Sequence, residues 1–336
     1  MKNLYKLSFF ALMISGTLIT ISSSSWIMMW AGLEINLLSI IPLLTNVKNK
    51  MESEASMKYF ITQALASTIF LFSTIALMSK TMTQLNSSSI LMDCAILTKM
   101  GAAPFHFWFP EIMEGLNWST STIMLTWQKI APMVIFMYLP KSIIVTTMTI
   151  MSSMMISGLM GINQTSLRKI LAYSSINHIG WMIGAMMTNQ AIWMMYMIIY
   201  TLMTINITFM LKMNNIFQMN QLMNSMNQSK SMKIMFSLNF LSLGGLPPFI
   251  GFIPKWMTIN NLIDQKLYPL TLMMIIMTLM TLFFYMRITV SAMTMSNTET
   301  MKQNQSKQQI NNYNIKLHRT LSTINHPYTN KLYLSI

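Results

Sequence analysis

Two segments of the chain carry the same interrupted pattern, Gly101-Ala-Ala-Pro-Phe-His-Phe-Trp-Phe-Pro110 and Gly245-Leu-Pro-Pro-Phe-Ile-Gly-Phe-Ile-Pro254. Both read G-x-x-P-F-x4-P. Proline removes a backbone donor and interrupts a helix, so each segment predicts a break in helical structure. The first closes the fourth apolar run and the second lies within the ninth, and these two runs are oppositely directed. Paired interruptions of this kind are typical of an inverted repeat with a binding path at the breaks.

The composition surrounding these segments is that of a membrane protein. Charged residues make up 9% of the 336 residues, hydrophobic residues 53%, and the mean hydropathy is +0.47. A soluble domain carries roughly 25% charged residues to cover its surface. The chain therefore predicts an all-α polytopic membrane protein whose solvent is lipid.

Apolar runs of about 20 residues, the length that spans a bilayer, recur along the chain. They predict ten transmembrane helices in a domain over 1–291, followed by a polar tail over 292–336. Leu317–Ile336 is a weak candidate for an eleventh helix, because it carries several charged and polar residues. The ten predicted spans are 4–21, 25–45, 57–79, 86–104, 117–139, 142–164, 168–187, 190–211, 235–262 and 268–291.

The basic residues divide unequally between the two sides of this predicted topology. Of the 22 Lys and Arg residues, sixteen fall on the N-terminal side, three on the other side, and three within spans. Positive residues favour the side that is not translocated, so the N-terminus is expected on the matrix (or cytoplasmic) side. The same scatter between apolar runs argues against nucleic-acid binding, which needs a clustered basic face.

Four ionisable side chains lie where the spans should be buried. Glu34 and Lys129 fall in the middle of the second and fifth spans, whereas Lys99 precedes the first break and Lys255 follows the second. An ionised group at the bilayer centre costs about 2.5–3.5 kcal/mol, so such groups pair, meet water or become neutral. Burial lowers the pKa of a lysine and a nearby carboxylate raises it. A lysine whose surroundings switch between these conditions takes up and releases a proton without any cofactor.

Two histidines are weaker candidates for the same chemistry. His178 lies in the middle of a span beside Ser174 and Ser175, where a supporting hydrogen bond and a relay role are both consistent with the sequence. His106 lies within the first break. Glu111 and Glu114 follow that break, and we expect them to be solvated loop charges. The structural alternatives are a static hydrogen bond to a neighbouring helix for Lys129, an ion pair for Glu34, a position near the interface on the N-terminal side for Lys99 and a capping cation for Lys255.

No segment has the spacing of a cofactor or metal site. Cys94 is the single cysteine, and the four histidines lie far apart, so haem, iron–sulfur, flavin, nucleotide and metal binding are not expected. The 42 methionines are spread among the apolar runs. A coding bias such as that of animal mitochondrial genomes explains this distribution better than a copper pathway.

Several motifs, in order, resemble one family. They are Gly32-Leu-Glu-Ile-Asn36, Glu54-Ala-Ser-Met-Lys-Tyr-Phe60, Lys99-Met-Gly-Ala-Ala-Pro-Phe-His-Phe-Trp-Phe-Pro-Glu111, Ala172-Tyr-Ser-Ser-Ile-Asn-His178 and Gly244-Gly-Leu-Pro-Pro-Phe-Ile-Gly-Phe252. Between about residues 10 and 290 the chain resembles the chain 2 family of animal mitochondrial NADH:ubiquinone oxidoreductase. These are antiporter-like subunits of the membrane arm of respiratory complex I.

The resemblance implies a function and a setting. It implies a proton-translocating subunit of an NADH:ubiquinone reductase (EC 7.1.1.2) in the mitochondrial inner membrane, with no redox centre of its own. NADH, FMN, iron–sulfur clusters and ubiquinone would belong to other subunits. The implied partners are a neighbouring antiporter-like chain, small membrane chains and phospholipids such as cardiolipin, with no nucleic acid.

The resemblance also implies a role for each buried charge. The residue matching Glu34 pairs with the one matching Lys99, the one matching Lys129 lies on a central hydrophilic axis, and the one matching Lys255 passes protons to the neighbouring chain. Two other functions remain open. One is a cation/proton antiporter subunit without a redox partner, and the other is a purely structural membrane subunit in which the charges are static.

Overall fold

The regular structure of this computed structural model is helical throughout the residues that it describes, 2–45, 49–79, 85–139, 142–226 and 230–294. One isolated antiparallel bridge joins Ser166 to Gln218. The helices are α1 (Lys2–Ser22), α2 (Trp26–Leu44), α3 (Lys50–Met78), α4 (Leu85–Met100), α5 (Trp108–Gly115), α6 (Trp118–Leu125), α7 (Trp127–Tyr138), α8 (Ile143–Ile162), α9 (Leu167–Thr188), α10 (Gln190–Met213), α11 (Met219–Met226), α12 (Lys230–Gly244), α13 (Phe252–Asp264) and α14 (Tyr268–Thr294).

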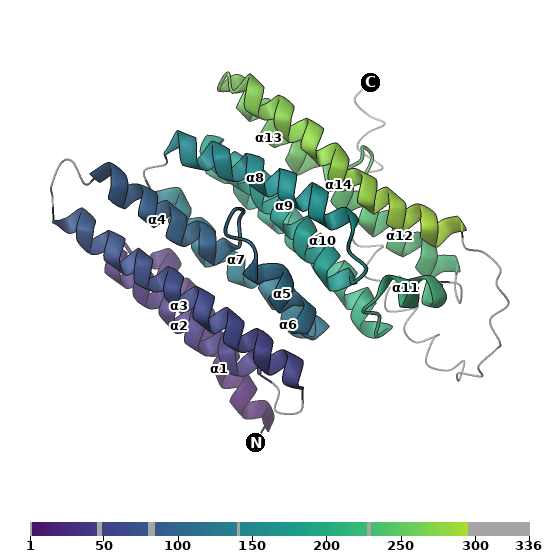
Figure 1. Ribbon diagram of the computed structural model, residues 1–336, viewed down its shortest axis with the longest axis horizontal. Helices are drawn as coiled ribbons and strands as arrows, with labels where there is room; N and C mark the ends of the chain where they lie inside the picture. Colours follow the sequence, from purple (N-terminus) through teal and green to yellow (C-terminus); the bar gives the residue numbers. More distant parts are fainter. Residues whose placement is uncertain (1, 46–48, 80–84, 140–141, 227–229, 295–336) are drawn as a thin grey trace, which may run out of the picture. The chain divides into compact units, whose positions relative to one another are not determined.

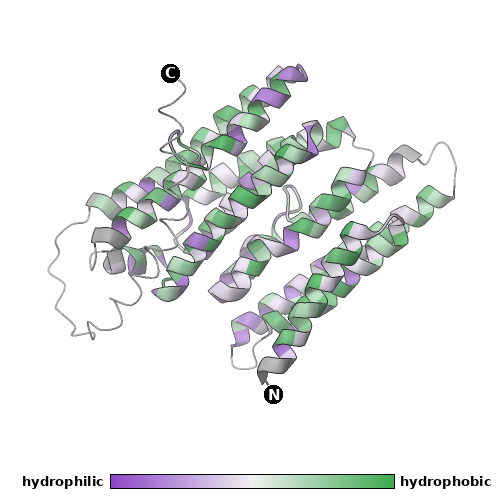
Figure 2. Ribbon diagram, turned by 180° about the vertical axis from the view of Figure 1, so that it is seen from behind, coloured by the Kyte–Doolittle hydropathy of each residue, from purple (hydrophilic) through white to green (hydrophobic). Residues whose placement is uncertain are grey.

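Six of these helices, α1, α2, α3, α8, α10 and α14, are long and apolar enough to cross a bilayer. Hydrophobic residues run along them in Figure 2. Large apolar side chains also cover their outer faces; Phe72 is 63% exposed, Ile144 75% and Leu279 61%. Contiguous apolar surface of this extent is typical of a protein in contact with lipid. The predicted all-α, multi-span membrane protein is confirmed.

Small residues let α1 and α2 approach closely. A Cβ atom placed on Gly16 would lie 2.9 Å from the backbone nitrogen of Asn36, and one on Gly32 would lie 2.9 Å from the backbone nitrogen of Thr20. Helices in lipid associate through such close backbone packing, because lipid tails are as apolar as the side chains. The pair forms one wall of the molecule, with α3 packed against α2.

The chain leaves the helical conformation at both G-x-x-P-F-x4-P segments (Figure 1). Gly101 and Gly245 have φ values of 75° and 77°, which glycine adopts without strain. In each case the glycine N–H bonds three residues back and the next N–H bonds five residues back, as from Ala102 to Leu97 and from Leu246 to Leu241. This is the Schellman ending of a helix. The repeated sequence therefore produces the same helix ending twice, while the peptide bond before Pro104 is cis only in the first segment.

Helix α9 is the common neighbour of the two interruptions. It packs against α5, which follows the first, and against α13, which follows the second. Every residue from Ile170 to Met186 on α9 is buried. A helix that is buried on all sides needs no polar face. The polar residues that α9 does carry in its interior, including Asn177 and His178, are therefore in contact with protein.

The structure corrects several predicted boundaries. The fifth predicted span, 117–139, is not one continuous helix, because Thr126 (φ −113°, ψ −71°) separates α6 from α7. Helix α3 begins at Lys50 rather than 57, since a polar first turn outside the apolar run still forms helix. A short helix, α11, occupies part of the predicted loop between 211 and 235.

The predicted boundary at 291 falls inside a helix, because α14 continues to Thr294. The segment 295–336, which includes the weak candidate helix at 317–336, lies outside the described residues. The division into a domain over 1–291 and a polar tail over 292–336 stays a prediction.

Candidate functional site

Lys129 occupies the centre of the buried site. It lies on α7, three residues after the interruption at Thr126, and is 2% exposed. Its Nζ atom donates a hydrogen bond of 3.1 Å to the hydroxyl of Tyr200 on α10. The same nitrogen lies 4.9 Å from the centroid of the Tyr200 ring and 5.5 Å from that of Phe109. Ring faces attract a cation, so an aromatic cage holds this ammonium group.

Phe109 comes from α5, the short helix that follows the first interruption. The break therefore does more than end α4: it turns the chain so that α5 contributes an aromatic ring to the cage of Lys129. The helical repeat of α5 alone does not specify this contact, which depends on how α5 packs between α3 and α9.

His178 on α9 continues the row beyond Tyr200. The centroids of the two rings are 5.0 Å apart, and His178 Nδ1 lies 2.9 Å from the hydroxyl of Tyr196. Its Nε2 atom is buried and has no hydrogen-bond partner in the part of the chain that the structure describes. His178 lies within electrostatic range of both Lys129 and Lys255. The structure therefore brings the imidazole near both lysines.

Lys255 lies at the start of α13 and closes the second interruption. It is 6% exposed, and its Nζ atom donates a hydrogen bond of 2.8 Å to the carbonyl oxygen of Gly244, the last residue of α12. The Nζ atom also lies 5.9 Å from the ring of Trp181. Trp181 follows His178 by three residues on α9, so the two share one face of that helix. The lysine satisfies a carbonyl that the break leaves free.

Lys99, near the end of α4, has a different environment. Its side chain is 7% exposed, and within the described ranges its ammonium group forms neither a hydrogen bond nor an ion pair. It faces a small cavity of about 20 Å³. That volume is sufficient for about one water molecule. The cavity is lined by Leu33, Asn36, Leu37, Tyr59, Gln63, Lys99, Gln128 and Pro132.

Buried amides form the polar wall of this cavity. Asn36 on α2 and Gln128 on α7 exchange two hydrogen bonds of 3.1 and 3.0 Å, and the Tyr59 hydroxyl donates to Gln128 at 3.4 Å. The Nε2 atom of Gln63 is buried without a partner among the described residues. A water in the cavity would find several polar partners, as buried waters require. Gln128 precedes Lys129 on α7, but Lys129 itself does not line the cavity.

Glu34 lies on α2, one turn of helix from the cavity. It is partly buried, and its Oε2 atom has no hydrogen-bond partner in the described chain. Its carboxylate lies within electrostatic range of Lys99. Within the described ranges, however, no carboxylate oxygen of Glu34 lies within 4.0 Å of a lysine nitrogen. The structure brings Glu34 and Lys99 near each other without direct contact.

His106 is buried inside the first interruption and is 2% exposed. Its Nδ1 atom lies 3.3 Å from the carbonyl oxygen of Pro104, and its ring lies 4.4 Å from that of Phe107. These contacts are with its own loop. The structure therefore does not bring His106 into the row formed by Lys129, Tyr200 and His178.

Glu111 and Glu114 are not loop charges, contrary to the prediction. Both lie on α5, where Glu111 forms an ion pair of 3.1 Å with Lys58 of α3 and Glu114 forms one of 2.6 Å with Lys169 of α9. The apolar run was too short to predict a helix after Pro110. These ion pairs link α5 to its two neighbours.

Sequence reasoning did not identify the tyrosines and amides of this site. Tyr196 and Tyr200 are fully buried in the middle of α10, whereas membrane tyrosines are enriched at the interfaces. Asn36, Gln63 and Gln128 are amides inside apolar runs. Their depth was the available signal, because a buried polar group without a partner is costly whether or not it is charged.

The site can hold protons on Lys129 and His178. A hydrogen bond joins Lys129 to the Tyr200 hydroxyl, whereas within the described ranges the nitrogens of His178 bond to Tyr196 or to no group, and His178 meets Tyr200 only through its ring. No group of three or more metal-binding side chains occurs among the described residues.

Comparison with known proteins identifies relatives along most of the chain. The family model described as NADH:quinone oxidoreductase/Mrp antiporter, transmembrane, matches residues 23–282. NADH-ubiquinone oxidoreductase chain 2 of Anopheles gambiae is 47% identical over 298 residues, which is 87% of this chain and 86% of the relative. The corresponding proteins of Locusta migratoria and Gallus gallus are 45% and 38% identical, covering 88% and 94% of this chain and 88% and 90% of theirs.

Two solved structures share the fold. A chain of respiratory complex I from Thermus thermophilus matches with a TM-score of 0.81 at 21% identity, over 90% of this chain and 73% of that one. A chain of the Mrp complex from Dietzia sp. matches with a TM-score of 0.74 at 15% identity, over 88% of this chain and 62% of that one.

Proposed function

This chain belongs to the NADH:quinone oxidoreductase/Mrp antiporter family, among the animal NADH-ubiquinone oxidoreductase chain 2 proteins, and from that premise we propose how it works. It is a membrane-arm subunit of respiratory complex I that translocates protons. Electron transfer from NADH to ubiquinone in other subunits drives this translocation, and the whole complex catalyses the reaction of EC 7.1.1.2.

In this proposal the chain holds no redox centre. NADH, FMN, iron–sulfur clusters and ubiquinone belong to other subunits, and this chain supplies only protonatable side chains. It crosses the mitochondrial inner membrane ten times, with the N-terminus in the matrix and an inverted repeat that relates the two interrupted spans. Its partners are a neighbouring antiporter-like chain, small membrane chains and phospholipids such as cardiolipin.

The observation that carries the proposal is the buried row from Lys129 through Tyr200 to His178. A hydrogen bond of 3.1 Å joins its first two members, and the rings of the last two have centroids 5.0 Å apart. An ionised lysine at this depth costs about 2.5–3.5 kcal/mol. A role as a proton carrier explains why a lysine occupies this position in spite of that cost.

We assign roles along this row. Lys129 is the central proton carrier, and Tyr200 and His178 pass its proton toward Lys255. Lys99 exchanges protons with Lys129 through the cavity of about 20 Å³, and Glu34 stabilises the charged form of Lys99 from a distance. His106 acts only through the conformation of its loop, because its contacts are local.

The test is Lys129→Met in the assembled complex. Lys50→Met, at the exposed start of α3, is the matched control. Proton translocation and ubiquinone-dependent NADH oxidation should both fall by at least about tenfold in the first variant and stay unchanged in the control. NADH oxidation by a water-soluble electron acceptor should be unaffected in both. Unchanged proton translocation in Lys129→Met would refute the role of the row.

The structural similarity to the Mrp chain supports a second candidate function, that of a cation/proton antiporter subunit without redox coupling. Native electrophoresis of gently solubilised membranes, stained for NADH oxidation and probed for this chain, separates the two functions. Migration with the largest NADH-oxidising band supports the complex I subunit. Migration in a smaller, inactive band would favour the antiporter, and sodium-dependent proton exchange would then be measured.

A further inference from the structure

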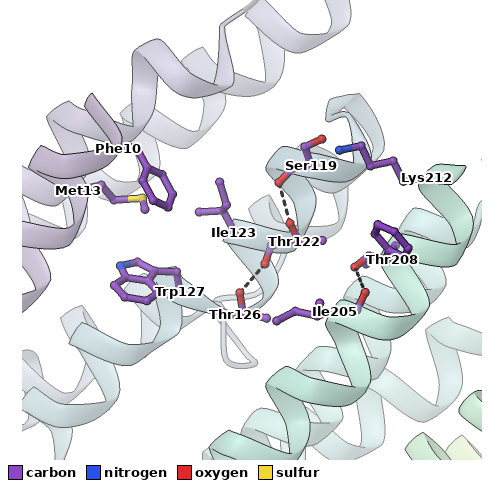
Figure 3. A pocket seen from close by; sticks show the side chains of 11 residues that line it. Phe10, Met13, Ser119, Thr122, Ile123, Thr126, Trp127, Ile205, Thr208 and Lys212 are labelled. Carbon is purple, nitrogen blue, oxygen red and sulfur yellow. Dashed lines mark hydrogen bonds between the residues drawn. The ribbon is translucent and has the colours of Figure 1, made fainter. Parts of the chain in front are cut away.

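A groove of about 390 Å³ opens between α1 and α10, away from the buried lysines (Figure 3). Helix α6 and the first residue of α7 form its floor. Its volume lies in the range of roughly 300–1,000 Å³ that is usual for small-molecule sites. The proposed proton row does not use this groove, so it requires its own explanation.

The groove has two distinct ends. Ser119 and Lys212 lie together at one end, whereas Thr126 and Ile205 lie at the other (Figure 3). Ser119 and Thr126 are seven residues apart on α6 and its end, which corresponds to a length of about 10 Å. This is about a third of the roughly 30 Å hydrocarbon core of a bilayer. The groove is therefore no longer than one leaflet, and Lys212 at one of its ends lies in the last turn of α10.

The walls of the groove are apolar and face outward. Phe10 on α1 is 42% exposed, and Ile205 and Phe209 on α10 are 48% and 50% exposed. The hydroxyls of Thr122 and Thr126 each donate to a carbonyl of their own helix at 2.7 Å. Because these donors are already satisfied, the groove has little to offer water, and an apolar chain suits it better.

The end that holds Lys212 is basic. Lys212 is exposed and lies in the last turn of α10, and within the described ranges it forms no ion pair. Lys6 is exposed and precedes Phe10 by four residues on α1, so it lies on the same face of α1 one turn closer to the N-terminus. An apolar groove that is no longer than one leaflet and has a basic end complements an anionic amphiphile.

We propose that this groove binds an anionic phospholipid, with one acyl chain along α6 and the phosphate of the headgroup beside Lys212. The site is separate from proton translocation itself. Its inner end, at Thr126 and Trp127, adjoins the interruption between α6 and α7, and Lys129 follows two residues later. The acyl chain packs against this interruption and supports the position of α7.

The proposal is tested in the intact complex with photoreactive phospholipids. Phosphatidylglycerol and phosphatidylcholine, each with a diazirine in the acyl chain, are added separately to mildly solubilised complex, illuminated, and mapped by mass spectrometry. Peptides that contain Phe10, Ile123 and Phe209 should be labelled about fivefold more by the anionic probe, since a lysine near an anionic lipid contributes about 1 kcal/mol. The exposed face of α14 around Leu272 and Leu279 serves as the reference for non-selective labelling.

Two pairs of variants identify the contacts. Lys212→Gln should remove the anionic preference at the groove, whereas Lys233→Gln, on α12 outside the groove, should leave it unchanged. Ile123→Trp should block labelling of the groove by both probes, whereas Ile198→Trp, on the exposed face of α10, should not.

Three results would overturn the proposal. One is equal labelling of the groove by both probes, and another is an anionic preference that survives Lys212→Gln. The third is no lipid label in the groove while α14 is labelled, which would mean that a protein segment covers it. Normal proton translocation in a complex without groove labelling would still leave the proposed function intact, so the two proposals fail independently.

Discussion

The two interruptions end their helices in the same way, but their lysines have different environments. Gly101 and Gly245 have φ values that differ by 2°, and both end their helices with the same pair of hydrogen bonds. Lys255 bonds to the carbonyl oxygen of Gly244 at its own break. Lys99 bonds to no group in the described chain and faces a polar cavity.

This difference shows that a repeated motif sets the backbone and not the chemistry. Lys255 follows its break and reaches back to the free carbonyl, whereas Lys99 precedes its break and lines a polar cavity. One lysine therefore stabilises the end of a helix, and the other has no hydrogen bond or ion pair within the described residues. Four predictions test this contrast.

Removing each lysine should separate stability from function. In Lys255→Met the carbonyl of Gly244 loses its donor, so stability should fall by about 1–3 kcal/mol and proton translocation should also be lost. In Lys99→Met a buried charge without a partner disappears, so translocation should be lost while stability is unchanged or higher. Thermal unfolding of the purified complex and proton translocation in liposomes measure the two effects. Equal destabilisation by both variants would contradict the contrast.

Substituting the two glycines should give unequal effects. Both Gly101→Ala and Gly245→Ala force an alanine to positive φ, at a cost of about 1–2 kcal/mol. The new Cβ at 245 would also lie 2.8 Å from Cδ and 2.9 Å from Nζ of Lys255, whereas the Cβ at 101 would lie 3.3 Å from Phe109.

We therefore expect Gly245→Ala to lower the unfolding temperature more, and to reduce proton translocation more, than Gly101→Ala. Both are read in the same assays as the lysine variants. A larger loss of unfolding temperature and proton translocation in Gly101→Ala would show that the close contact with Lys255 does not limit either property.

Drying the cavity beside Lys99 should reduce translocation without unfolding the protein. Gln63→Leu removes an amide whose Nε2 atom has no described partner. Translocation should fall by roughly two- to fivefold, the size of one lost water-mediated hydrogen bond of about 0.5–1 kcal/mol. Gln128→Leu is the contrasting variant, because it breaks two hydrogen bonds to Asn36 and should also destabilise the fold. No loss of translocation in Gln63→Leu would argue against water at Lys99.

The exposed ion pairs of α5 should matter least. Glu111→Gln removes the contact with Lys58, but both side chains are largely exposed, at 58% and 45%. Solvent screens such pairs, so unfolding temperature and translocation should stay within the error of the wild-type measurements. Lys58→Gln is the reciprocal control. A clear loss in either variant would show that α5 needs this tether to place Phe109 beside Lys129.

Much of the fold followed from the sequence because lipid imposes simple rules. The ends of α1, α2, α8, α10 and α14 were predicted to within three residues, since length and hydropathy define them, whereas α3 begins seven residues before its predicted span. The interruption at Thr126 and the helical state of 108–115 were not predicted. Neither has a composition signal of its own, and both depend on packing against α3, α9 and α10.

The candidate site was predicted unevenly. Glu34, Lys99, Lys129 and Lys255 were found because a charge in an apolar run is rare and costly. Tyr200, Gln63 and Gln128 were missed because neutral polar side chains occur in many membrane helices without a role. His178 was found, but only the structure brings it near both Lys129 and Lys255.

From the sequence alone it follows that this protein lies in a membrane, where its two Gly/Pro interruptions fall, and which charged residues lie within spans. These properties depend on transfer free energies and backbone preferences, which act residue by residue. Only the tertiary structure decided which buried groups meet. The hydrogen bond of Lys129 to Tyr200 joins helices that are far apart in the chain. The bond of Lys255 to Gly244 closes a break, and Lys99 has no partner within the described residues. Packing decides each of these outcomes.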